Sequence, residues 1–285
     1  MSSVVKSRYA SAEETAREYY NSPDADNFYF EVWGGEDIHV GLYRDAQERV
    51  YDASRRTVAE MAKRVPGLGP GTRVLDIGSG YGGSGRYLAH EYGCPVTALN
   101  ISETENERGR QKNRDQGVNH LVEIIDGSFE DLPFEDASYD VVWSQDAILH
   151  SGDRRRVLEE AVRVLRPGGY FVFTDPMQDD RCPQEALAPI LERIHLSTLG
   201  SPGFYQRTLT ELGLEDLGFE DHSEMIARHY GRIREVLVNE EDNLAGTVSE
   251  GYIERMKRGL QHWVDGGRAG HLRWGIFLFR KPEEA

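Results

Sequence analysis

Four glycines follow a short apolar run in the segment VLDIGSGYGG, residues 74–83. Glycines at such a turn let the backbone approach a ligand closely and let the next helix begin beside the strand. By itself, the G-x-G-x-x-G spacing is a weak indication of nucleotide binding. Two polar residues narrow the choice of ligand. Asp76 lies just before the first glycine, and Asn100 stands where a nicotinamide- or flavin-binding protein would carry an acid.

The Asp76 carboxylate favours a ligand with an ammonium group, because a pyrophosphate would bring like charges together. S-adenosylmethionine has an ammonium, a sulfonium, a ribose and an adenine, and it has no phosphate. The loop therefore predicts this ligand, although Asp76 could also simply cap the turn. Asn100 can still bind a ribose hydroxyl, so a nicotinamide-dependent enzyme remains an alternative. Measuring the binding of S-adenosylmethionine and of NAD would distinguish the two.

Strands and helices alternate around this loop. We expect strands at 73–77, 95–100, 121–125, 139–144 and 170–175, separated by helices that end at Tyr92 or span 102–116 and 153–165. A helix over 45–65 precedes them, and the alternating segment 271–280 predicts a final strand. This order is typical of a doubly wound α/β domain with a mostly parallel sheet.

The flanking segments interrupt this alternation. Residues 12–43 are rich in aromatic and turn-forming residues and predict an irregular lid, and helices are expected near 183–199, 203–212 and 224–266. The predicted division is a lid and helix (1–65), a cofactor-binding core (66–180), a helical substrate-binding insertion (181–268) and a final strand with a tail (269–285). Ligands of open α/β sheets bind above the carboxyl ends of the strands.

The composition is strongly acidic, with 33 Lys and Arg against 49 Asp and Glu and a net charge of −16. Such a surface repels phosphate backbones and anionic lipids, so we expect neither nucleic-acid nor membrane partners. No apolar run has the length of a membrane span or a signal peptide. Cys94 and Cys182 lack metal-ligand spacing, which predicts free thiols, a cytoplasmic protein and no metal site.

Longer segments carry a family resemblance. LDIGSGYGG, DGSFEDLPFEDASYDVVWSQDAILH and VLRPGGYFVFTDP together resemble class I S-adenosylmethionine-dependent methyltransferases. With MKRGLQHWVDGGRAGHLRWG, the chain resembles sarcosine/dimethylglycine N-methyltransferases, which complete the synthesis of the osmoprotectant glycine betaine. The resemblance runs from Tyr19 to Arg280. It implies a Rossmann-like, seven-stranded sheet with an N-terminal lid and a helical insertion.

The resemblance also implies cofactor contacts. The residues that match contacts to the methionine part are Asp76, Gly78, Gly80 and Gln145. Asn100 and Ile101 match contacts to the ribose, and Ser128 and Phe129 match contacts to the adenine. Many methyltransferases have an acid in place of Ser128, which leaves Asp126 as the alternative adenine partner. The positions that match a lid over the cofactor are Tyr29, Trp33, Ile38 and His39, of which Trp33 could equally pack in the core.

The implied reaction requires a neutral amine, so the site must accept a proton or select the unprotonated form. His150 in SQDAILH matches a histidine that related phosphoethanolamine methyltransferases pair with a lid tyrosine. Here that tyrosine is Tyr20, with Tyr19 as the alternate. Asp146 could face the substrate amine or hold the lid tyrosine. Without the family, His150 could equally be a structural residue.

The amino-acid substrate offers two further groups to bind. Aromatic faces stabilise a methylated ammonium, and the candidates are Tyr20, Tyr29, Trp33, Tyr205 and Trp263. The carboxylate calls for a cation, preferably a guanidinium, and the candidates are Arg207, Arg268 and Arg273, with His262 behind them. The sequence does not choose among these arginines.

Two rival functions remain open at this point. A methyltransferase of phosphoethanolamine would need a denser cluster of Lys and Arg than the insertion contains. A non-catalytic cofactor-binding module would not need Tyr20, Asp146 and His150, all of which are present. The sequence sets neither the oligomeric state nor the relative use of glycine, sarcosine and dimethylglycine.

Overall fold

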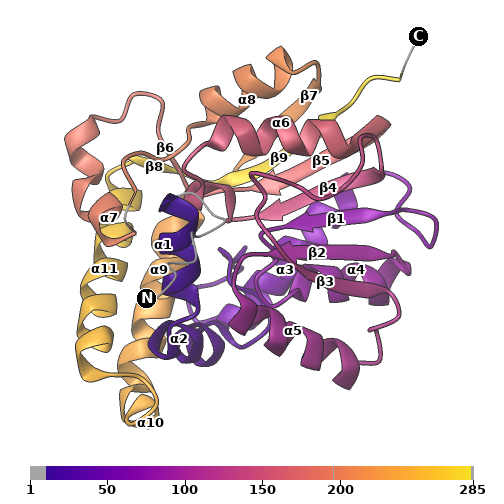
Figure 1. The fold of residues 1–285 in the computed structure, drawn as a ribbon. Coiled ribbons are helices and arrows are strands. Elements are labelled where there is room, and N and C mark those ends of the chain that lie inside the picture. Colours follow the sequence, from indigo (N-terminus) through magenta and orange to yellow (C-terminus); the bar gives the residue numbers. More distant parts are fainter. Residues whose placement is uncertain (1–10, 195, 284–285) are drawn as a thin grey trace, which may run out of the picture.

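A seven-stranded sheet in the order β3-β2-β1-β4-β5-β9-β7 forms the centre of the molecule (Figure 1). The computed structural model describes residues 11–194 and 196–283. The strands of this sheet are β1 (Val74–Ile77), β2 (Val96–Asn100), β3 (Val122–Asp126), β4 (Tyr139–Gln145), β5 (Leu165–Thr174), β7 (Glu215–Asp221) and β9 (Gly275–Arg280). Strands β1 to β5 are parallel, and β9 is antiparallel between β5 and β7. The predicted α/β class with a mostly parallel seven-stranded sheet is confirmed.

Helices cover both faces of the sheet (Figure 1). One face carries α3 (Val50–Arg64), α4 (Gly83–Tyr92) and α5 (Glu103–Asp115), and the other carries α6 (Arg154–Val164) and α8 (Pro202–Glu211). In β4, Val141 and Trp143 belong to the core on the α3 and α4 side, whereas Val142 belongs to the core on the α6 and α8 side. Burial of each such side chain contributes about 1.5–3 kcal/mol. Because burial favours one alternation of side chains along each strand, it also determines which residues lie at the strand ends.

A further group of helices lies beyond the carboxyl ends of the parallel strands (Figure 1). Its members are α1 (Ser11–Tyr20), α2 (Pro23–Trp33), α7 (Ala188–Arg193), α9 (Glu224–Asn239), α10 (Glu241–Leu244) and α11 (Glu250–Arg268). Phe28 of α2, Ile233 of α9 and Leu260 of α11 share a core there. Short elements complete the chain: the 3-10 turns η1 (Ile148–His150) and η2 (Gln184–Leu187), and the ribbon of β6 (Met177–Gln178) with β8 (Leu272–Arg273).

The N-terminal segment, predicted to be an irregular lid, is helical over residues 11–33 apart from a short break. Ser22 caps α2 by accepting a hydrogen bond from the amide of Ala25, and Pro23 occupies the first helical position. The buried residues Phe28, Tyr29, Val32 and Trp33 recur at helical spacing. The helical spacing of these apolar residues was therefore present in the sequence, although the aromatic and turn-forming composition obscured it.

The C-terminal part differs from the prediction in two places. The predicted single helix over 224–266 is divided into α9, the short α10 and α11, because Gly246 has a φ of 90° and Ser249 caps α11. Residues 215–221, assigned to a helical insertion, form β7 at an edge of the main sheet. Most side chains of β7 are exposed, so its sequence lacks the apolar alternation of a buried strand. Among the described residues, no helix has the length and apolar character needed to cross a membrane.

Candidate active site

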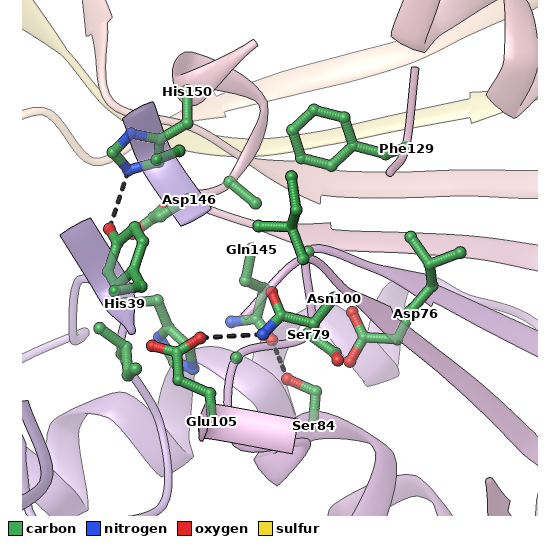
Figure 2. Close-up of a pocket in the computed structure, with 18 of the residues that line it drawn as sticks. His39, Asp76, Ser79, Ser84, Asn100, Glu105, Phe129, Gln145, Asp146 and His150 are labelled. Carbon is green, nitrogen blue, oxygen red and sulfur yellow. Dashed lines mark hydrogen bonds between the residues drawn. The ribbon is translucent and has the colours of Figure 1, made fainter. Parts of the chain in front are cut away.

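The larger of two adjoining cavities lies at the carboxyl ends of β1, β2 and β4 (Figure 2). Most of the predicted cofactor residues line it: Ile38, His39, Asp76, Gly78, Gly80, Asn100, Ile101, Ser128, Phe129 and Gln145. The other two predicted residues, Tyr29 and Trp33, line the second cavity instead. The sheet thus brings into one cavity residues that lie far apart in the sequence.

The glycine loop shapes one wall of this first cavity. Gly78 and Gly80 have φ values of 74° and 52°, which residues with side chains rarely adopt. A Cβ atom on Gly78 would also lie 2.3 Å from the Cβ of Ala147. The amides of Gly78 and Ser79 donate to the carbonyl oxygen of Leu99 at 2.8 and 3.1 Å, which ties the loop to β2.

Two buried acids reach the first cavity from different elements. Burial raises the pKa of Asp76, in β1, to about 7, and it raises the pKa of Glu105, in α5, to about 8. The Glu105 carboxylate accepts a hydrogen bond from Asn100 Nδ2 at 2.8 Å (Figure 2). The acid missing from the end of β2 is therefore supplied by the first turn of the next helix. Glu105 was not predicted because the motif fixes only the strand end.

Helix α1 closes the first cavity at Ser128. The Ser128 hydroxyl donates to the Glu13 carboxylate of α1 and accepts from the amide of Glu130 at 2.9 Å. Asp126, the alternative adenine partner, does not line the cavity, and it accepts a hydrogen bond from Asn106 at 2.7 Å. The acid beside Ser128 thus comes from Glu13, which no sequence motif indicated.

The second cavity is smaller and shares five lining residues with the first: Tyr20, Ile38, His39, Asp146 and His150. Of the predicted substrate residues, Tyr29 and Trp263 line its remainder, together with Trp33. His229 and Tyr230 of α9 also line it and were not predicted. The Tyr230 ring stacks on Trp263 with centroids 4.7 Å apart, so aromatic side chains form much of the wall.

Tyr20 and His150 are joined in the wall that the two cavities share. The Tyr20 hydroxyl lies 3.0 Å from His150 Nε2. Burial raises the pKa of Tyr20 well above its usual value, so the hydroxyl keeps its proton and can donate it to Nε2. The turn that carries His150 is held from behind, because the amide of Leu149 donates to Asp175 at 3.0 Å. Figure 2 shows His150 on the side of the first cavity away from Asp76.

Asp146 follows β4 with a φ of 53°, a conformation uncommon for a non-glycine residue. Its carboxylate accepts hydrogen bonds from the Val40 amide (2.7 Å), Thr174 Oγ1 (2.7 Å) and Trp274 Nε1 (2.8 Å). These bonds join the loop after α2, the end of β5 and the segment before β9. We interpret Asp146 as an anchor of this loop rather than as a partner of the substrate amine.

Comparisons with known proteins agree with this arrangement. Residues 75–173 match the family model of the methyltransferase domain. The chain is 62% identical over 268 residues to the sarcosine/dimethylglycine N-methyltransferase of Halorhodospira halochloris, which covers 94% of this chain and 96% of the relative. The chain belongs to the sarcosine/dimethylglycine N-methyltransferase family.

Two further relatives support the same membership. A dimethylglycine N-methyltransferase of Parasynechococcus marenigrum is 48% identical over 95% of this chain and 97% of its own. A crystal structure of a candidate sarcosine dimethylglycine methyltransferase from Galdieria sulphuraria is 41% identical. It matches with a TM-score of 0.88 over 94% of this chain and 100% of that chain. The likeness therefore includes the helices beyond the strand ends as well as the sheet.

S-adenosylmethionine is the cofactor of this methyltransferase, and the first cavity has polar atoms that suit it. Asp76 Oδ2, Ser79 Oγ and Gln145 Nε2 are buried there without a hydrogen-bond partner. Because buried polar groups are normally paired, these atoms fit the ammonium and carboxylate of the methionine part. The apolar side chains of Ile101 and Phe129 fit the adenosine part. Among the described residues, no group of three His, Cys, Asp or Glu is arranged to hold a metal ion.

Tyr205, predicted to contact the substrate, reaches neither cavity. It is fully buried in α8, its hydroxyl donates to Asp175 at 2.6 Å, and its ring packs on Phe173 with centroids 5.2 Å apart. The ring is packed in the apolar core on this face of the sheet. In the N-methyltransferase Tyr205 therefore supports Asp175, which holds the turn that carries His150.

The predicted carboxylate-binding arginines also lie away from both cavities. Arg207 is exposed on α8, and Arg268 is exposed at the end of α11. Arg273 forms ion pairs with Asp179 at 2.7 Å and Asp221 at 3.5 Å. The linings of the two cavities therefore do not support the prediction that one of the three binds the substrate carboxylate.

His262 is also misplaced for the predicted role. It is exposed on α11 and lines a separate groove at the surface. Successive residues of a helix point about 100° apart, and Trp263 takes the position that faces the second cavity. The HW pair in the sequence therefore contributes its tryptophan alone to the site.

Proposed function

We propose that the enzyme transfers a methyl group from S-adenosylmethionine to N,N-dimethylglycine, and also to sarcosine, with glycine betaine as the final product. The observation that carries this proposal is the wall shared by the two cavities. It places the hydrogen-bonded Tyr20 and His150 between a cavity suited to the cofactor and a smaller aromatic cavity. The names of the relatives supply the class of acceptor.

S-adenosylmethionine, when bound, supplies a sulfonium methyl group that needs no further activation. The protein must then orient the acceptor nitrogen and exclude water. Helix α1 serves both purposes, because Glu13 and Tyr20 line the cofactor cavity from this helix. An ion pair between Arg17 of α1 and Glu103 of α5, at 2.8 Å, holds the helix across the cavity.

Tyr20 and His150 provide a path for the amine proton. A tertiary amine is largely protonated near neutral pH, and it attacks only as the neutral form. The proton leaving the amine passes to the Tyr20 oxygen while the Tyr20 proton moves to His150 Nε2. No tyrosinate accumulates along this path, which agrees with the raised pKa of Tyr20.

The aromatic wall of the second cavity suits the quaternary product. A trimethylated nitrogen has no N–H to donate, and aromatic faces stabilise its positive charge by about 0.5–2 kcal/mol each. Tyr20, Tyr29, Tyr230 and Trp263 all line this cavity. The same wall stabilises positive charge as it develops on the attacking nitrogen.

Phosphoethanolamine is the rival acceptor. Proteins normally bind a phosphate through Lys or Arg. Among the described residues that line the second cavity, none is Lys or Arg. This lining favours an amino acid over a phosphate ester.

Turnover of labelled S-adenosylmethionine with dimethylglycine, sarcosine, glycine and phosphoethanolamine tests the proposal. We expect glycine betaine from dimethylglycine and no methylation of phosphoethanolamine, with products identified by mass spectrometry. Protein that binds the cofactor and leaves dimethylglycine unmethylated would overturn the proposal. If none of the four is methylated, the non-catalytic alternative gains support.

The composition is consistent with this role. A net charge of −16 favours solubility and fits a salt-stressed cell that accumulates glycine betaine. We also propose a cytoplasmic location, with which the free thiols of Cys94 and Cys182 are compatible.

A further inference from the structure

Four buried ring nitrogens without a hydrogen-bond partner belong to residues that line the second cavity. One is Nε2 of His39, which lines both cavities and lies 3.5 Å from the Asp37 carboxylate. The other three belong to residues that line the second cavity and not the first. They are Nε1 of Trp33, Nε1 of Trp263 and Nε2 of His229. These side chains are 4%, 2% and 1% exposed, and none of the three lines the first cavity. A buried donor left unpaired costs about 1–3 kcal/mol, so three around one cavity call for an explanation.

The hydrogen bonds of His229 determine which of its nitrogens carries the proton. The amide of Gly41 can only donate, and it points at His229 Nδ1 at 3.3 Å. The Tyr43 hydroxyl also lies 2.9 Å from Nδ1. Nδ1 therefore accepts, and burial lowers the pKa of His229 to about 3, which keeps the ring neutral. The single ring proton must then be on Nε2, which makes this atom a donor.

The three donors come from separate helices that converge beside the cavity. The rings of Trp33 (α2) and His229 (α9) lie 5.7 Å apart. Tyr230, the neighbour of His229, stacks on Trp263 of α11 at 4.7 Å. Tyr20 and His150 lie in the wall that the second cavity shares with the first. A ligand in the second cavity can therefore place its amine near Tyr20 and His150 and its hydrogen-bond acceptors near the three N–H groups.

We propose that Trp33, His229 and Trp263 form the carboxylate subsite for the amino-acid substrate, in place of the guanidinium expected from the sequence. This inference rests on the proposed function, because it assigns the second cavity to an N-methylated amino acid. A carboxylate offers acceptor lone pairs for all three N–H groups, whereas a hydroxyl or a methyl group in its place leaves donors unpaired.

Neutral donors also suit the charges of the reaction. A guanidinium in this cavity would repel the sulfonium in the adjoining cavity and the positive charge that develops on the nitrogen. With neutral donors, the substrate's own carboxylate compensates that charge. His39 lines both cavities, and although burial opposes it, Asp37 raises the His39 pKa. The Asp37 carboxylate lies 3.5 Å from His39 Nε2 and neutralises its charge.

The test compares two acceptors that share an amine: dimethylglycine and N,N-dimethylethanolamine, in which a hydroxyl replaces the carboxylate. Trp33→Phe and Trp263→Phe each keep an aromatic ring and remove one N–H. We expect each variant to raise KM for dimethylglycine about tenfold, equivalent to about 1.4 kcal/mol, with kcat changed less than threefold. KM for dimethylethanolamine should stay within twofold of wild type. Titration of glycine betaine into the complex with S-adenosylhomocysteine should show the same tenfold loss.

His262→Ala, next to Trp263 but on the exposed side of α11, is the matched control and should leave both KM values unchanged. Unchanged affinity for S-adenosylhomocysteine shows that each tryptophan variant is folded. An equal rise in KM for both acceptors would assign the tryptophans to packing and overturn the subsite. Loss of dimethylglycine binding in Arg268→Ala alone would overturn it in favour of the arginine. If wild-type enzyme does not methylate dimethylglycine, the proposed function itself fails, and the subsite fails with it.

Discussion

The two adjoining cavities differ in the polarity of their linings. The first contains the acids Glu13, Asp37, Asp76 and Glu105, in addition to the shared Asp146. Among the described residues, the part of the second cavity that is not shared has no acid in its lining, and it contains the three unpaired N–H donors. This difference matches a cationic cofactor on one side and an acceptor carboxylate on the other. The cationic cofactor and the carboxylate end of the substrate can thus be distinguished with neither Lys nor Arg in the described lining of either cavity.

The largest effect is expected from His150→Ala, which alters the wall between the cavities. General acid–base catalysis contributes about 10²–10⁴-fold, so kcat should fall by that factor at neutral pH. The affinities for S-adenosylhomocysteine and glycine betaine should change less than threefold, because the polar groups that line only one of the two cavities are unchanged. Single-turnover kinetics and calorimetric titration measure the two quantities.

His222→Ala provides the control for His150, because His222 lies outside both cavities and pairs with Glu220. It should methylate at the wild-type rate. A wild-type rate in His150→Ala would show that the amine proton leaves by another path. The shared wall would then separate the ligands without taking part in the chemistry.

A smaller but still large effect is expected from Asp76→Asn, which removes an acid from the first cavity alone. Loss of one partner from a buried charge pair costs about 3–5 kcal/mol, so affinity for S-adenosylmethionine should fall at least 10²-fold. Affinity for glycine betaine, measured with S-adenosylhomocysteine held at saturation, should stay within threefold. Asp126→Asn, at the end of β3 and outside the cavity, should behave as wild type.

Asp76 should also make cofactor binding depend on pH. Burial raises its pKa to about 7 in the ligand-free enzyme, whereas a bound ammonium favours the ionised form. Wild-type affinity should therefore rise from pH 6 to pH 8, and binding near pH 6.5 should release a proton. Calorimetry in buffers of different ionisation enthalpy detects that proton. A pH-independent wild-type affinity would mean that Asp76 does not pair with the ammonium.

An intermediate effect is expected from Asp146→Asn, which alters a residue common to both cavities. Three donors point at the Asp146 carboxylate, and an amide NH₂ would face one of them at a cost of about 1–3 kcal/mol. The loop after α2 should loosen, and the affinities for S-adenosylhomocysteine and glycine betaine should both fall about tenfold. A loss confined to glycine betaine would instead restore the predicted contact between Asp146 and the substrate amine.

The same contrast explains what could be predicted from the sequence. The first cavity is built from strand ends and a glycine loop, whose spacing is tied to the strand–turn–helix geometry, and Asp76, Gly78 and Asn100, predicted to contact the cofactor, all line it. Glu105 and Glu13 were missed because they reach the cavity from helices, where no fixed spacing relates them to the loop. The sheet was predicted from its buried strands. The edge strand β7 was missed because its exposed side chains leave no apolar pattern.

The second cavity is built where α2, α9 and α11 converge, and side chains from separate helices meet there through packing alone. A sequence shows where the arginines are, but it does not show which side of a helix packs against the core and which side faces solvent. Arg268 and His262 were therefore predicted as ligands, and both are exposed. His229 and Tyr230 carried no signal beyond their helical positions.

Glu105→Gln is expected to change stability rather than the rate of methyl transfer. In the folded protein, burial raises the Glu105 pKa from its ordinary value of 4.5 to about 8. The folded state then binds more protons than the unfolded state, so this contribution is complete below pH 4.5 and is lost as pH rises through 8. Glutamine cannot ionise, and it can still accept the hydrogen bond from Asn100. The ligand-free variant should have nearly the wild-type Tm at pH 5 and a Tm higher by about 10 °C or more at pH 8.5, since one pKa unit corresponds to about 1.4 kcal/mol and 1 kcal/mol to about 2–4 °C.

Glu107→Gln is the control for Glu105, because Glu107 is exposed on the same helix and pairs with Arg114. Its Tm should follow the wild-type pH dependence. Bound S-adenosylmethionine should narrow the gap between Glu105→Gln and wild type at pH 8.5, because the cationic ligand stabilises the ionised acid in wild type alone. A Tm gap that is the same at pH 5 and pH 8.5 would show that Glu105 titrates normally when folded. The first cavity would then owe its acidic character to Asp76, Asp37 and Glu13, and its contrast with the second cavity would rest on strand β1 and the lid.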